Sequence, residues 1–435
     1  MKKLKIALIC HFSTGQIRRQ LPLGGFKLEN NIRGIFSKPP KKFNDFAPWI
    51  PSLITEIEGF EDVELHVISP HIKLKKTIYS FLDKGIYYHF FKPDIFTLCR
   101  QIWRLCARPQ NESYAINRYL VKKIVKKINP DIINLFGTEN PYYSSTVLDI
   151  HEKPIFVTLQ TVYSNPKRKL YSEHFDQSRW DMEQLIFKKE NYYGSEGPMH
   201  TDLVRSYKEG TIILKQKFTK DKTDIPTGKL MVEYDFAFFS QHLSDKKGMT
   251  DAIKALALVS KKHPQVSMIV IGAGSKERMG ELKNKLQSHE IEKNVIFTGY
   301  FSEHADALRA AQTARFALLP VKLDHVSSTI LEAMHLGLPV VCYRTTGTPL
   351  INRDKETILL SDIGDIQGLA DSMIKLLEDS EYAKVLRTNA KEYVEREYDN
   401  TANARLLVNC LRAVYENYYY QTPIPSELFF EVEDK

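Results

Sequence analysis

Two carboxylates, Asp324 and Glu332, stand eight residues apart in a segment that changes from strand to helix character. The apolar run 316–319 predicts a buried strand, the apolar run 338–343 predicts another, and helical spacing fills the stretch between them. Two such strands joined by a helix form a parallel β-α-β unit. The two carboxylates are therefore expected at the carboxyl edge of a sheet, where α/β domains bind their ligands.

The start of the predicted helix has the features of an anion site. Ser327 and Ser328 are candidate N-caps, and Gly337 is a candidate C-terminal residue. The N–H groups of the first positions, Ser328, Thr329 and Ile330, together with the helix dipole, would bind a phosphate. A phosphate site between two carboxylates suits a nucleotide sugar, because carboxylates accept hydrogen bonds from sugar hydroxyls.

This stretch resembles the signature of the retaining glycosyltransferases of family 4, the glycosyl transferases group 1, which adopt the GT-B fold. That signature is a carboxylate, seven residues, Glu-Ala-Met, and then Gly-x-Pro-Val-Val. The corresponding residues here are Asp324, Glu332-Ala333-Met334 and Gly337-Leu338-Pro339-Val340-Val341. Most family members have Glu at the position of Asp324. The resemblance implies that Asp324 and Glu332 are catalytic-site residues that hold the donor sugar.

A second stretch, 240–248, resembles the family's Gly-Arg-Leu-x-x-x-Lys-Gly segment. It follows a predicted strand, 236–239, and precedes an amphipathic helix, 250–262. The family's lysine falls on Lys247, which would neutralise the donor diphosphate, and the family's arginine falls on His242. Histidine is a weaker cation whose charge depends on pH, so the diphosphate would meet less positive charge here.

A glycine turn follows the next predicted strand, 266–271. A dinucleotide-binding fingerprint would need a small residue where Glu277 stands, so Gly272 and Gly274 do not predict an NAD site. The resemblance instead implies that the backbone at these glycines approaches the nucleotide of the donor. After the following strand, family members read the nucleobase near the position of Tyr300.

The first half of the chain alternates strands and helices with weaker motifs. Glu139 follows a predicted strand, 131–136, and is a candidate catalytic carboxylate. Gln160 stands where the family's Val-Thr-x-His segment has its histidine; an amide can position a sugar hydroxyl but cannot take its proton. The family's glycine-rich loop, near the diphosphate or the acceptor, is expected at one of three glycines: Gly15, Gly24 and Gly25.

The order of the elements predicts the GT-B architecture, in which two doubly wound, Rossmann-like α/β domains face each other across a cleft. Residues 1–208 would form the acceptor domain and residues 230–400 the nucleotide-sugar domain. The linker, 209–229, accumulates Lys, Thr, Gly and Pro. In the family a terminal helix crosses back to the first domain, and residues 401–435 are expected to do so here.

The composition agrees with a globular protein of two domains. The chain has 435 residues, of which 43% are hydrophobic and 26% charged. No apolar run approaches the ~20 residues of a membrane span, and the run after Met1 is too short for a secretion signal. The scattered cysteines predict reduced thiols in a cytoplasmic protein: Cys10, Cys99, Cys106, Cys342 and Cys410.

Positive charge is concentrated in the first half of the chain. Residues 1–210 hold 32 Lys and Arg against 22 Asp and Glu, whereas residues 211–435 hold 29 against 31. The lysines at 122–127 and the arginines around Trp103 suit an anionic bilayer surface or a lipid diphosphate acceptor, although a solubilising basic face would have the same composition. No nucleic-acid recognition module accompanies this charge.

The resemblance implies transfer of a sugar from a UDP- or GDP-linked donor to a saccharide or lipid-linked acceptor, in surface polysaccharide or glycolipid biosynthesis and without a cofactor. No Asp-x-Asp pair occurs in the chain, and Lys247 with the helix N-terminus could supply the positive charge, so we expect metal-independent activity. Two alternatives stay open. One is a nucleotide-sugar-binding scaffold without chemistry. The departures at His242 and Gln160 favour it, as does Leu350, which stands where the family's Gly-Gly-x-Pro-Glu loop has its glutamate. The other is an epimerase or phosphorylase on the same architecture.

Overall fold

The computed structural model of the protein describes residues 3–35, 40, 43–94, 114–166, 175–197, 199–220, 228, 230–323 and 326–430, with the backbone alone at 28, 32 and 199. The chain forms two compact units. Unit 1 consists of residues 1–165, 174–221 and 399–435, and unit 2 of residues 166–173 and 222–398. Each unit has helices around a largely parallel sheet, so the predicted α/β class is confirmed.

Unit 1 is built on an eight-stranded sheet with the order β3-β4-β2-β1-β5-β6-β7-β8. All neighbouring strands are parallel except β3 and β4, which are antiparallel. Nearly every residue of β1, β5 and β6 is buried, as expected of parallel strands covered on both faces. The strands are β1 (Leu4–Ile9), β2 (Val63–Pro70), β3 (Ile78–Asp83), β4 (Ile86–Phe91), β5 (Ile132–Phe136), β6 (Ile155–Thr158), β7 (Tyr192–Ser195) and β8 (Ile212–Lys215).

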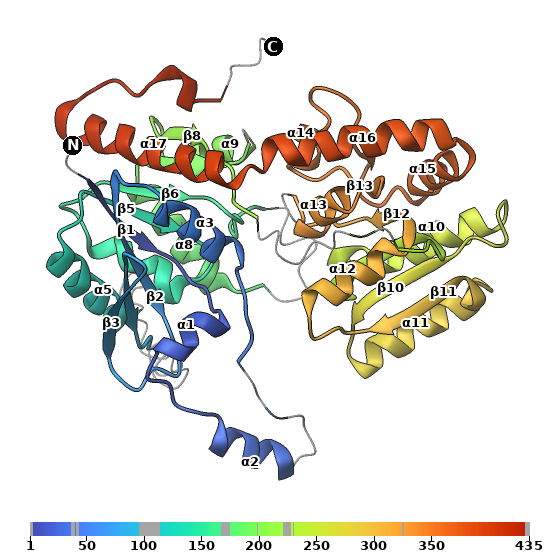
Figure 1. The fold of residues 1–435 in the computed structure, drawn as a ribbon, viewed down its shortest axis with the longest axis horizontal. Helices are drawn as coiled ribbons and strands as arrows, with labels where there is room; N and C mark the ends of the chain where they lie inside the picture. Colours follow the sequence, from blue (N-terminus) through green and yellow to red (C-terminus); the bar gives the residue numbers. More distant parts are fainter. Residues whose placement is uncertain are drawn as a thin grey trace. The chain divides into compact units, whose positions relative to one another are not determined.

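Helices cover both faces of the unit 1 sheet (Figure 1). The buried side chains of α3 (Trp49–Glu58) and α17 (Asn400–Tyr420) form one core with the sheet, and those of α5 (Ala115–Ile128) and α8 (Gln177–Lys189) form another. The remaining helical segments are α1 (Gly15–Gln20), α2 (Lys27–Ile35), α6 (Pro141–Ser144), η2 (Ser145–Asp149), α9 (Met199–Tyr207) and η5 (Ser426–Leu428).

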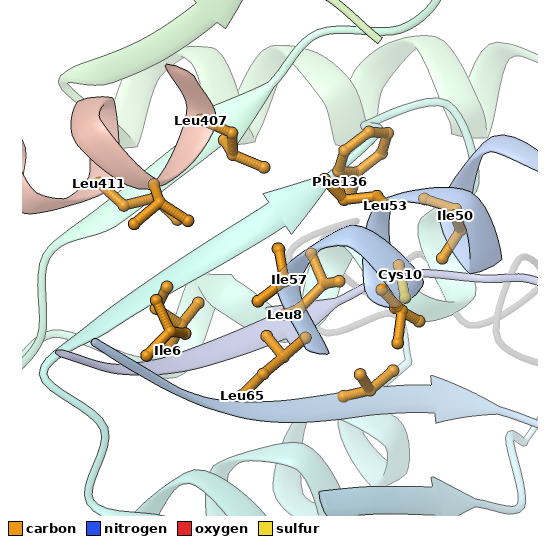
Figure 2. Close-up of a cluster of buried hydrophobic side chains, with 14 of the residues drawn as sticks. Ile6, Leu8, Cys10, Ile50, Leu53, Ile57, Leu65, Phe136, Leu407 and Leu411 are labelled. Atoms are coloured by element: carbon orange, nitrogen blue, oxygen red, sulfur yellow. The ribbon is translucent and has the colours of Figure 1, made fainter. Parts of the chain in front are cut away.

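The helix α17 returns the chain to unit 1 after unit 2 has been completed. Its Leu407 and Leu411 lie in the same buried cluster as the inner side chains of β1 and α3 (Figure 2). At the edge of this core, Asp62 accepts hydrogen bonds from Arg405 and Arg412, both at 2.9 Å. The last helix is therefore part of the unit 1 core.

The predicted linker at 209–229 contains an element of unit 1. Ile213 and Leu214 are buried in β8, which is the edge strand beside β7. The structure places the change from unit 1 to unit 2 after residue 221. The sequence did not reveal β8 because it is only four residues long and lies among Lys, Thr and Gly.

Unit 2 contains a six-stranded parallel sheet with the order β11-β10-β9-β12-β13-β14. The strands are β9 (Tyr234–His242), β10 (Met268–Ala273), β11 (Val295–Gly299), β12 (Ala314–Leu319), β13 (Val340–Tyr343) and β14 (Leu359–Ser361). The helical segments are η3 (Asp245–Lys247), α10 (Met249–Ser260), α11 (Lys276–Ser288), η4 (Glu292–Asn294), α12 (His304–Gln312), α13 (Ser328–His335), α14 (Thr348–Ile351), α15 (Ile366–Glu378) and α16 (Ser380–Glu397).

In each sheet the strand order reverses at one point. The reversal lies between β9 and β12 in unit 2 and between β1 and β5 in unit 1. Parallel sheets bind ligands at the carboxyl ends of the strands beside such a point, because the loops there diverge and leave a crevice. The loops that follow these four strands are therefore the first places to search for a site.

Two further features bear on the expectations from composition. Of the five cysteines, Cys10, Cys342 and Cys410 are buried and free, and Cys99 and Cys106 lie outside the described residues. Over the described part of the chain, none of the helices combines the length and the apolar character that a bilayer span requires.

Candidate functional site

In unit 2, the loop after β9 packs against the loop after β12. Gly248, which follows η3, has a φ of +81°, and a Cβ at this position would stand 1.9 Å from the carbonyl oxygen of Pro320. The N–H of Lys322 donates to the carbonyl of Lys246 at 3.0 Å. The two loops therefore approach backbone to backbone, which glycine at 248 permits because it has no side chain and tolerates a positive φ.

This approach brings Lys247 to the start of α13. The Nζ of Lys247 donates to the Oγ of Ser327 at 3.4 Å. Ser327 is the N-cap of α13, and its Oγ lies 3.0 Å from the Oγ1 of Thr329. The lysine predicted to neutralise a phosphate and the helix N-terminus predicted to bind one are thus neighbours.

The first turn of α13 offers fewer N–H groups than expected. Ser328 and Thr329 are its first residues, so their N–H groups have no acceptor within the helix. The N–H of Ile330 instead donates to the carbonyl of Ser327 at 3.0 Å. The expectation of a free N–H at Ile330 was wrong because the helix begins with a tighter, 3-10-like turn.

Glu332 lies one turn into α13, with its side chain 21% exposed. Its Oε2 is 3.6 Å from the Nε2 of His304, the first residue of α12. Asp324, the predicted partner of Glu332, lies outside the described residues. The sequence did not single out His304. Only the folded chain brings the start of α12 close to Glu332 of α13.

Arg278, which the sequence also did not reveal, holds the turn that carries Lys247. Its Nε donates to the carbonyl of Leu243 at 2.9 Å, and its Nη2 donates to Asp245 at 2.6 Å and to Thr250 at 3.0 Å. Burial alone would raise the pKa of Asp245, but the hydrogen bonds from Thr250 and Arg278 and the charge of Arg278 lower it below its usual value. Arg278 thereby fixes η3 to the start of α10.

A second lysine beside η3 is compensated by an acid. The Nζ of Lys322 lies 2.7 Å from the Oδ2 of Asp251, and the hydroxyl of Tyr343 donates to the same oxygen at 2.8 Å. Burial and this hydrogen bond raise the pKa of Tyr343, so its hydroxyl stays protonated as a donor. Asp251 thus neutralises Lys322.

The other predicted donor-site residues lie at the ends of β9, β10 and β11. A Cβ at Gly272 would stand 1.9 Å from the carbonyl oxygen of Ser240, so packing between β10 and β9 accounts for this glycine. A Cβ at Gly274 would stand 3.1 Å from the side chain of Arg278. His242 and Tyr300 are exposed, the latter at 61%. Nucleotide contact at these four positions remains a prediction.

In unit 1, Glu139 and Gln160 converge at Gly137. Gly137 follows β5 with a φ of +88°, and a Cβ there would stand 2.5 Å from Nε2 of Gln160, 2.6 Å from Oε2 of Glu139 and 2.7 Å from the hydroxyl of Tyr143. Gln160 also donates to the carbonyl of Phe136 at 3.2 Å. The structure therefore brings together the two residues predicted in this unit, and glycine at 137 makes room for them.

The environment of Glu139 changes its acidity. The pKa of Glu139 is raised to about 7, chiefly by burial and also by the charge of Glu183, although hydrogen bonds and the charge of Arg179 lower it. Its Oε2 has no hydrogen-bond partner among the described residues. The Nε of Arg179 donates to the backbone carbonyl of Glu139 at 2.6 Å and so fixes the loop. A carboxyl group in this state can gain or lose a proton near pH 7.

His11, directly after β1, is a third polar residue at this edge that the sequence did not single out. Its Nδ1 lies 2.6 Å from the hydroxyl of Tyr142, and its ring packs on Phe46 with centroids 4.5 Å apart. Burial, with a smaller contribution from His71, lowers the pKa of His11 to about 4. The imidazole is therefore neutral at pH 7 and can exchange hydrogen bonds without carrying charge.

At the three candidate glycines of unit 1, the structure shows backbone hydrogen bonds or open space. Gly15 begins α1, and its N–H donates to Asp45 at 3.4 Å. The N–H of Gly24 donates to the carbonyl of Lys73 at 2.8 Å, in a short antiparallel pairing of the two chain segments. Gly25 has open space where a side chain would be. A ligand role for these glycines stays a prediction.

Comparison with known protein families gives a match for unit 2. Residues 221–393 match the family described as glycosyl transferases group 1. Unit 2 is therefore similar to the glycosyl transferases group 1 over most of its length. The match covers about two fifths of the chain, and the matched region holds Lys247, Ser327 and Glu332.

Among curated relatives, a 2-deoxystreptamine N-acetyl-D-glucosaminyltransferase from Niallia circulans is 23% identical over 181 residues, which is 42% of this chain and 44% of that protein. An N-acetyl-alpha-D-glucosaminyl L-malate synthase from Bacillus anthracis is 25% identical over 174 residues, 40% of this chain and 42% of that protein. The chain thus spans less than half the length of these relatives in the matched region.

Solved structures extend the likeness to both units. The sucrose-phosphate synthase of Thermosynechococcus elongatus superposes with a TM-score of 0.65 at 15% identity, covering 95% of this chain and 99% of that one. Anabaena HepE in complex with UDP and glucose gives 0.59 at 16% identity, covering 94% and 100%. At such identities the likeness establishes the fold, which is GT-B, and leaves the substrates open.

Proposed function

We propose that the protein is a retaining glycosyltransferase that moves a sugar from a UDP- or GDP-linked donor to a saccharide or lipid-linked acceptor, in surface polysaccharide or glycolipid biosynthesis. The observation that carries the proposal is the contact of Lys247 with the N-cap of α13, one turn before Glu332. This arrangement offers positive charge for a diphosphate and a carboxylate for a sugar within one helical turn.

The proposed chemistry depends on charge at the leaving group. As the bond between sugar and diphosphate breaks, negative charge grows on the diphosphate, and positive groups fixed nearby lower the barrier. Lys247 and the N–H groups of Ser328 and Thr329 would supply this stabilisation. Glu332, with Asp324, would hold hydroxyls of the donor.

The unit 1 residues support a role toward the acceptor. A hydroxyl that attacks the sugar must lose its proton, and the carboxyl of Glu139 titrates close to pH 7 with one oxygen unpaired by described residues. Gln160 and the neutral His11 can orient that hydroxyl through hydrogen bonds. Glu139 would then receive the proton.

We also propose that no metal ion takes part. The chain has no Asp-x-Asp pair, which metal-dependent glycosyltransferases use to hold an ion between the protein and the diphosphate. Transfer should persist in EDTA at an unchanged rate. Loss of transfer in the chelator, with recovery on adding magnesium or manganese, would contradict this part of the proposal.

The basic first half of the chain supports a position at the inner face of a membrane for a protein that works on a lipid-linked acceptor. The departures at His242, Gln160 and Leu350 favour the alternative of a binding protein without chemistry. An epimerase is distinguished by interconversion of the donor sugar without any acceptor.

The primary experiment is a thermal-shift screen against UDP, GDP, ADP and CMP and their sugars, followed by a donor hydrolysis assay with the best ligand. A nucleotide that binds the folded state raises the melting temperature in proportion to its affinity. Stabilisation by UDP or GDP together with sugar release supports the transferase, and stabilisation without any release supports the binding protein. Absence of stabilisation by all four nucleotides would overturn the proposal.

A further inference from the structure

The exposed side of α5 in unit 1 combines apolar and basic side chains in one stripe. Ile116 is 55% exposed and Tyr119 is 65% exposed. One to three turns further along the same side are Lys122, Lys123, Lys126 and Lys127, all exposed. We define these six residues as the α5 face. Their spacing of three and four residues places them on one side of the helix.

The opposite side of α5 is firmly held in unit 1, so the α5 face is presented as a rigid surface. Leu120, Val121 and Ile124 are buried in the core against the sheet. The buried Asn117 accepts a hydrogen bond from the N–H of Asp94 at 2.7 Å and donates to the carbonyl of Tyr142 at 2.9 Å. The buried side thus fixes the helix, and the six residues of the α5 face take no part in this packing.

Further apolar side chains are exposed on the hairpin of β3 and β4, beside the lysine end of α5. Leu82 and Tyr87 are cross-strand partners, exposed at 57% and 39%. They point to the same side of the sheet as Ile78 and Phe91, which pack in the α5 core, because alternate residues of a strand share a face. The lysine end of α5 is close to this hairpin, since the charge of Lys127 acts on the imidazole of His89.

We propose that the α5 face binds an anionic lipid bilayer. The helix α5 itself contains no acidic residue. Of the described acids around it, Asp149 pairs with Arg118 and Glu152 interacts with Lys122. Tyrosine and isoleucine beside lysines match the chemistry of the interface, where apolar groups enter among the headgroups and ammonium groups meet lipid phosphates. A solubilising face would need the lysines but not an exposed Ile116 and Tyr119.

The buried side of α5 connects the helix to the candidate residues of unit 1. The carbonyl of Tyr142 accepts from Asn117 of α5, and the hydroxyl of Tyr142 contacts His11. Resting on the proposed function, this link implies that bilayer binding delivers an acceptor carried in the lipid to the edge of the sheet at Glu139. The substrate class is thereby narrowed to lipid-linked acceptors.

Co-sedimentation of the full chain with vesicles tests the proposal. Binding is expected to vesicles that contain phosphatidylglycerol in phosphatidylcholine and to be far weaker to phosphatidylcholine alone. The double variant Lys122→Gln/Lys126→Gln should bind about 25-fold more weakly, since each lysine near an anionic surface contributes about fivefold. The double variant Ile116→Ser/Tyr119→Ser should also lose binding at the same lipid charge.

Two matched controls lie on α16 in unit 2. Lys384→Gln/Lys391→Gln removes two exposed lysines, and Val385→Ser removes an apolar side chain that is 57% exposed. Both should bind vesicles as the unaltered protein does. Equal binding to charged and neutral vesicles, no binding, or unchanged binding of both α5 variants with melting temperatures intact would overturn the inference.

Transfer to a water-soluble acceptor separates this inference from the proposed function. The α5 variants should keep that activity and lose transfer to an acceptor embedded in anionic vesicles. If soluble transfer is present and the vesicle experiment fails, only the α5 inference falls. If soluble transfer is absent in the unaltered protein while vesicle binding follows the α5 face, the proposed function falls instead.

Discussion

The candidate residues of unit 1 and unit 2 occupy equivalent positions, the carboxyl ends of the strands where each sheet reverses its order, but they differ in charge. In unit 2 a lysine and a helix N-terminus face each other, with Asp251 and Arg278 compensating or fixing the groups around them. In unit 1 a buried carboxyl, an amide and a neutral imidazole meet instead. The same fold thus offers one edge for an anion and one for a neutral hydroxyl.

The comparison also shows why the unit 2 edge is easier to predict from the sequence than the unit 1 edge. The unit 2 edge is made by two loops that touch along their backbones, and such contacts require particular residues at fixed spacing, such as Gly248. The unit 1 edge is made by single side chains, Glu139 and Gln160, on separate loops. Glu139 and Gln160 could be expected only from their places after predicted strands, Gln160 with the help of the Val-Thr-x-His segment, whereas the unit 2 loops carry longer motifs.

The largest effect is expected at the cationic edge. Lys247→Ala should lower the turnover number for transfer about 10²- to 10³-fold, because a fixed positive group would be missing as the diphosphate leaves. The matched control is Lys246→Ala, an exposed lysine in the same turn. Near-normal turnover of the Lys247 variant, measured with a radiolabelled donor at saturation, would show that the two edges do not differ in the way proposed.

Backbone contact at the unit 2 edge is tested by Gly248→Ala. The new Cβ would meet the carbonyl of Pro320 at a positive φ, so we expect the free energy of unfolding to fall by about 2–4 kcal/mol. Gly280→Ala is the control, since Gly280 lies inside α11 with open space around it and alanine there should stabilise by about 0.5–1 kcal/mol. Urea unfolding of both variants gives the comparison. Equal stability of the two would mean that the loops can separate freely.

The neutral edge is expected to depend on pH through Glu139. Its pKa lies near 7 in the folded protein and at its ordinary value, 4.5, in the unfolded chain, so the folded state holds an extra proton between these values and loses stability as pH rises through that range. Glu139→Gln should therefore raise the melting temperature at pH 8, by an amount equivalent to about 1–3 kcal/mol, and leave it unchanged at pH 4.

An exposed carboxylate in the same unit serves as the reference for this measurement. Glu61→Gln removes a charge from the surface and should leave the pH dependence as it is. An equal response of the Glu61 and Glu139 variants would attribute the effect to net charge rather than to the buried site. In transfer assays, the Glu139 variant should also lose the rise of rate with pH around 7, because an amide cannot accept the proton.

The smallest effect is expected at His304. The pair of His304 with Glu332 is half exposed, and such pairs contribute about 0.2–1 kcal/mol. His304→Gln should therefore change the Michaelis constant for the donor by less than about fivefold and leave the turnover number nearly unchanged. Initial rates over a range of donor concentrations decide this, with His289→Gln on an exposed position of the same unit as the control. A loss of turnover above 10²-fold would contradict this prediction and indicate that His304 acts directly in the reaction.

Much of the unit 2 fold follows from local sequence. The predicted order of strand, helix and strand around Glu332 was confirmed, with Gly337 at a φ of +72°, because buried apolar runs and the helix-ending glycine act on nearby residues. The hairpin of β3 and β4 was missed. The strand β3 has only half-buried and exposed positions, whereas β4 buries Ile86, Tyr88, Phe90 and Phe91. The turn at Lys84 and Gly85, both with positive φ, joins the two strands.

The candidate site was less predictable than the fold. Lys247 and Glu332 were found through their spacing, whereas Arg278 acts on Asp245 across 33 residues and His11 on Tyr142 across 131. Such pairs depend on which strands become neighbours, which no local pattern specifies. The predicted free N–H at Ile330 failed for a related reason, because the first turn of a helix can close in two ways that the sequence does not distinguish.

The path of the chain has a consequence during synthesis. Unit 1 receives its last helix, α17, from residues that leave the ribosome only after the whole of unit 2, residues 222–398. At about 5–20 residues per second, the nascent first unit waits roughly 10 to 35 s. During this time the apolar surface that Leu407 and Leu411 will cover is exposed to solvent or to a chaperone. Translation that stops before α17 is made would therefore leave an aggregation-prone fragment rather than a smaller functional protein.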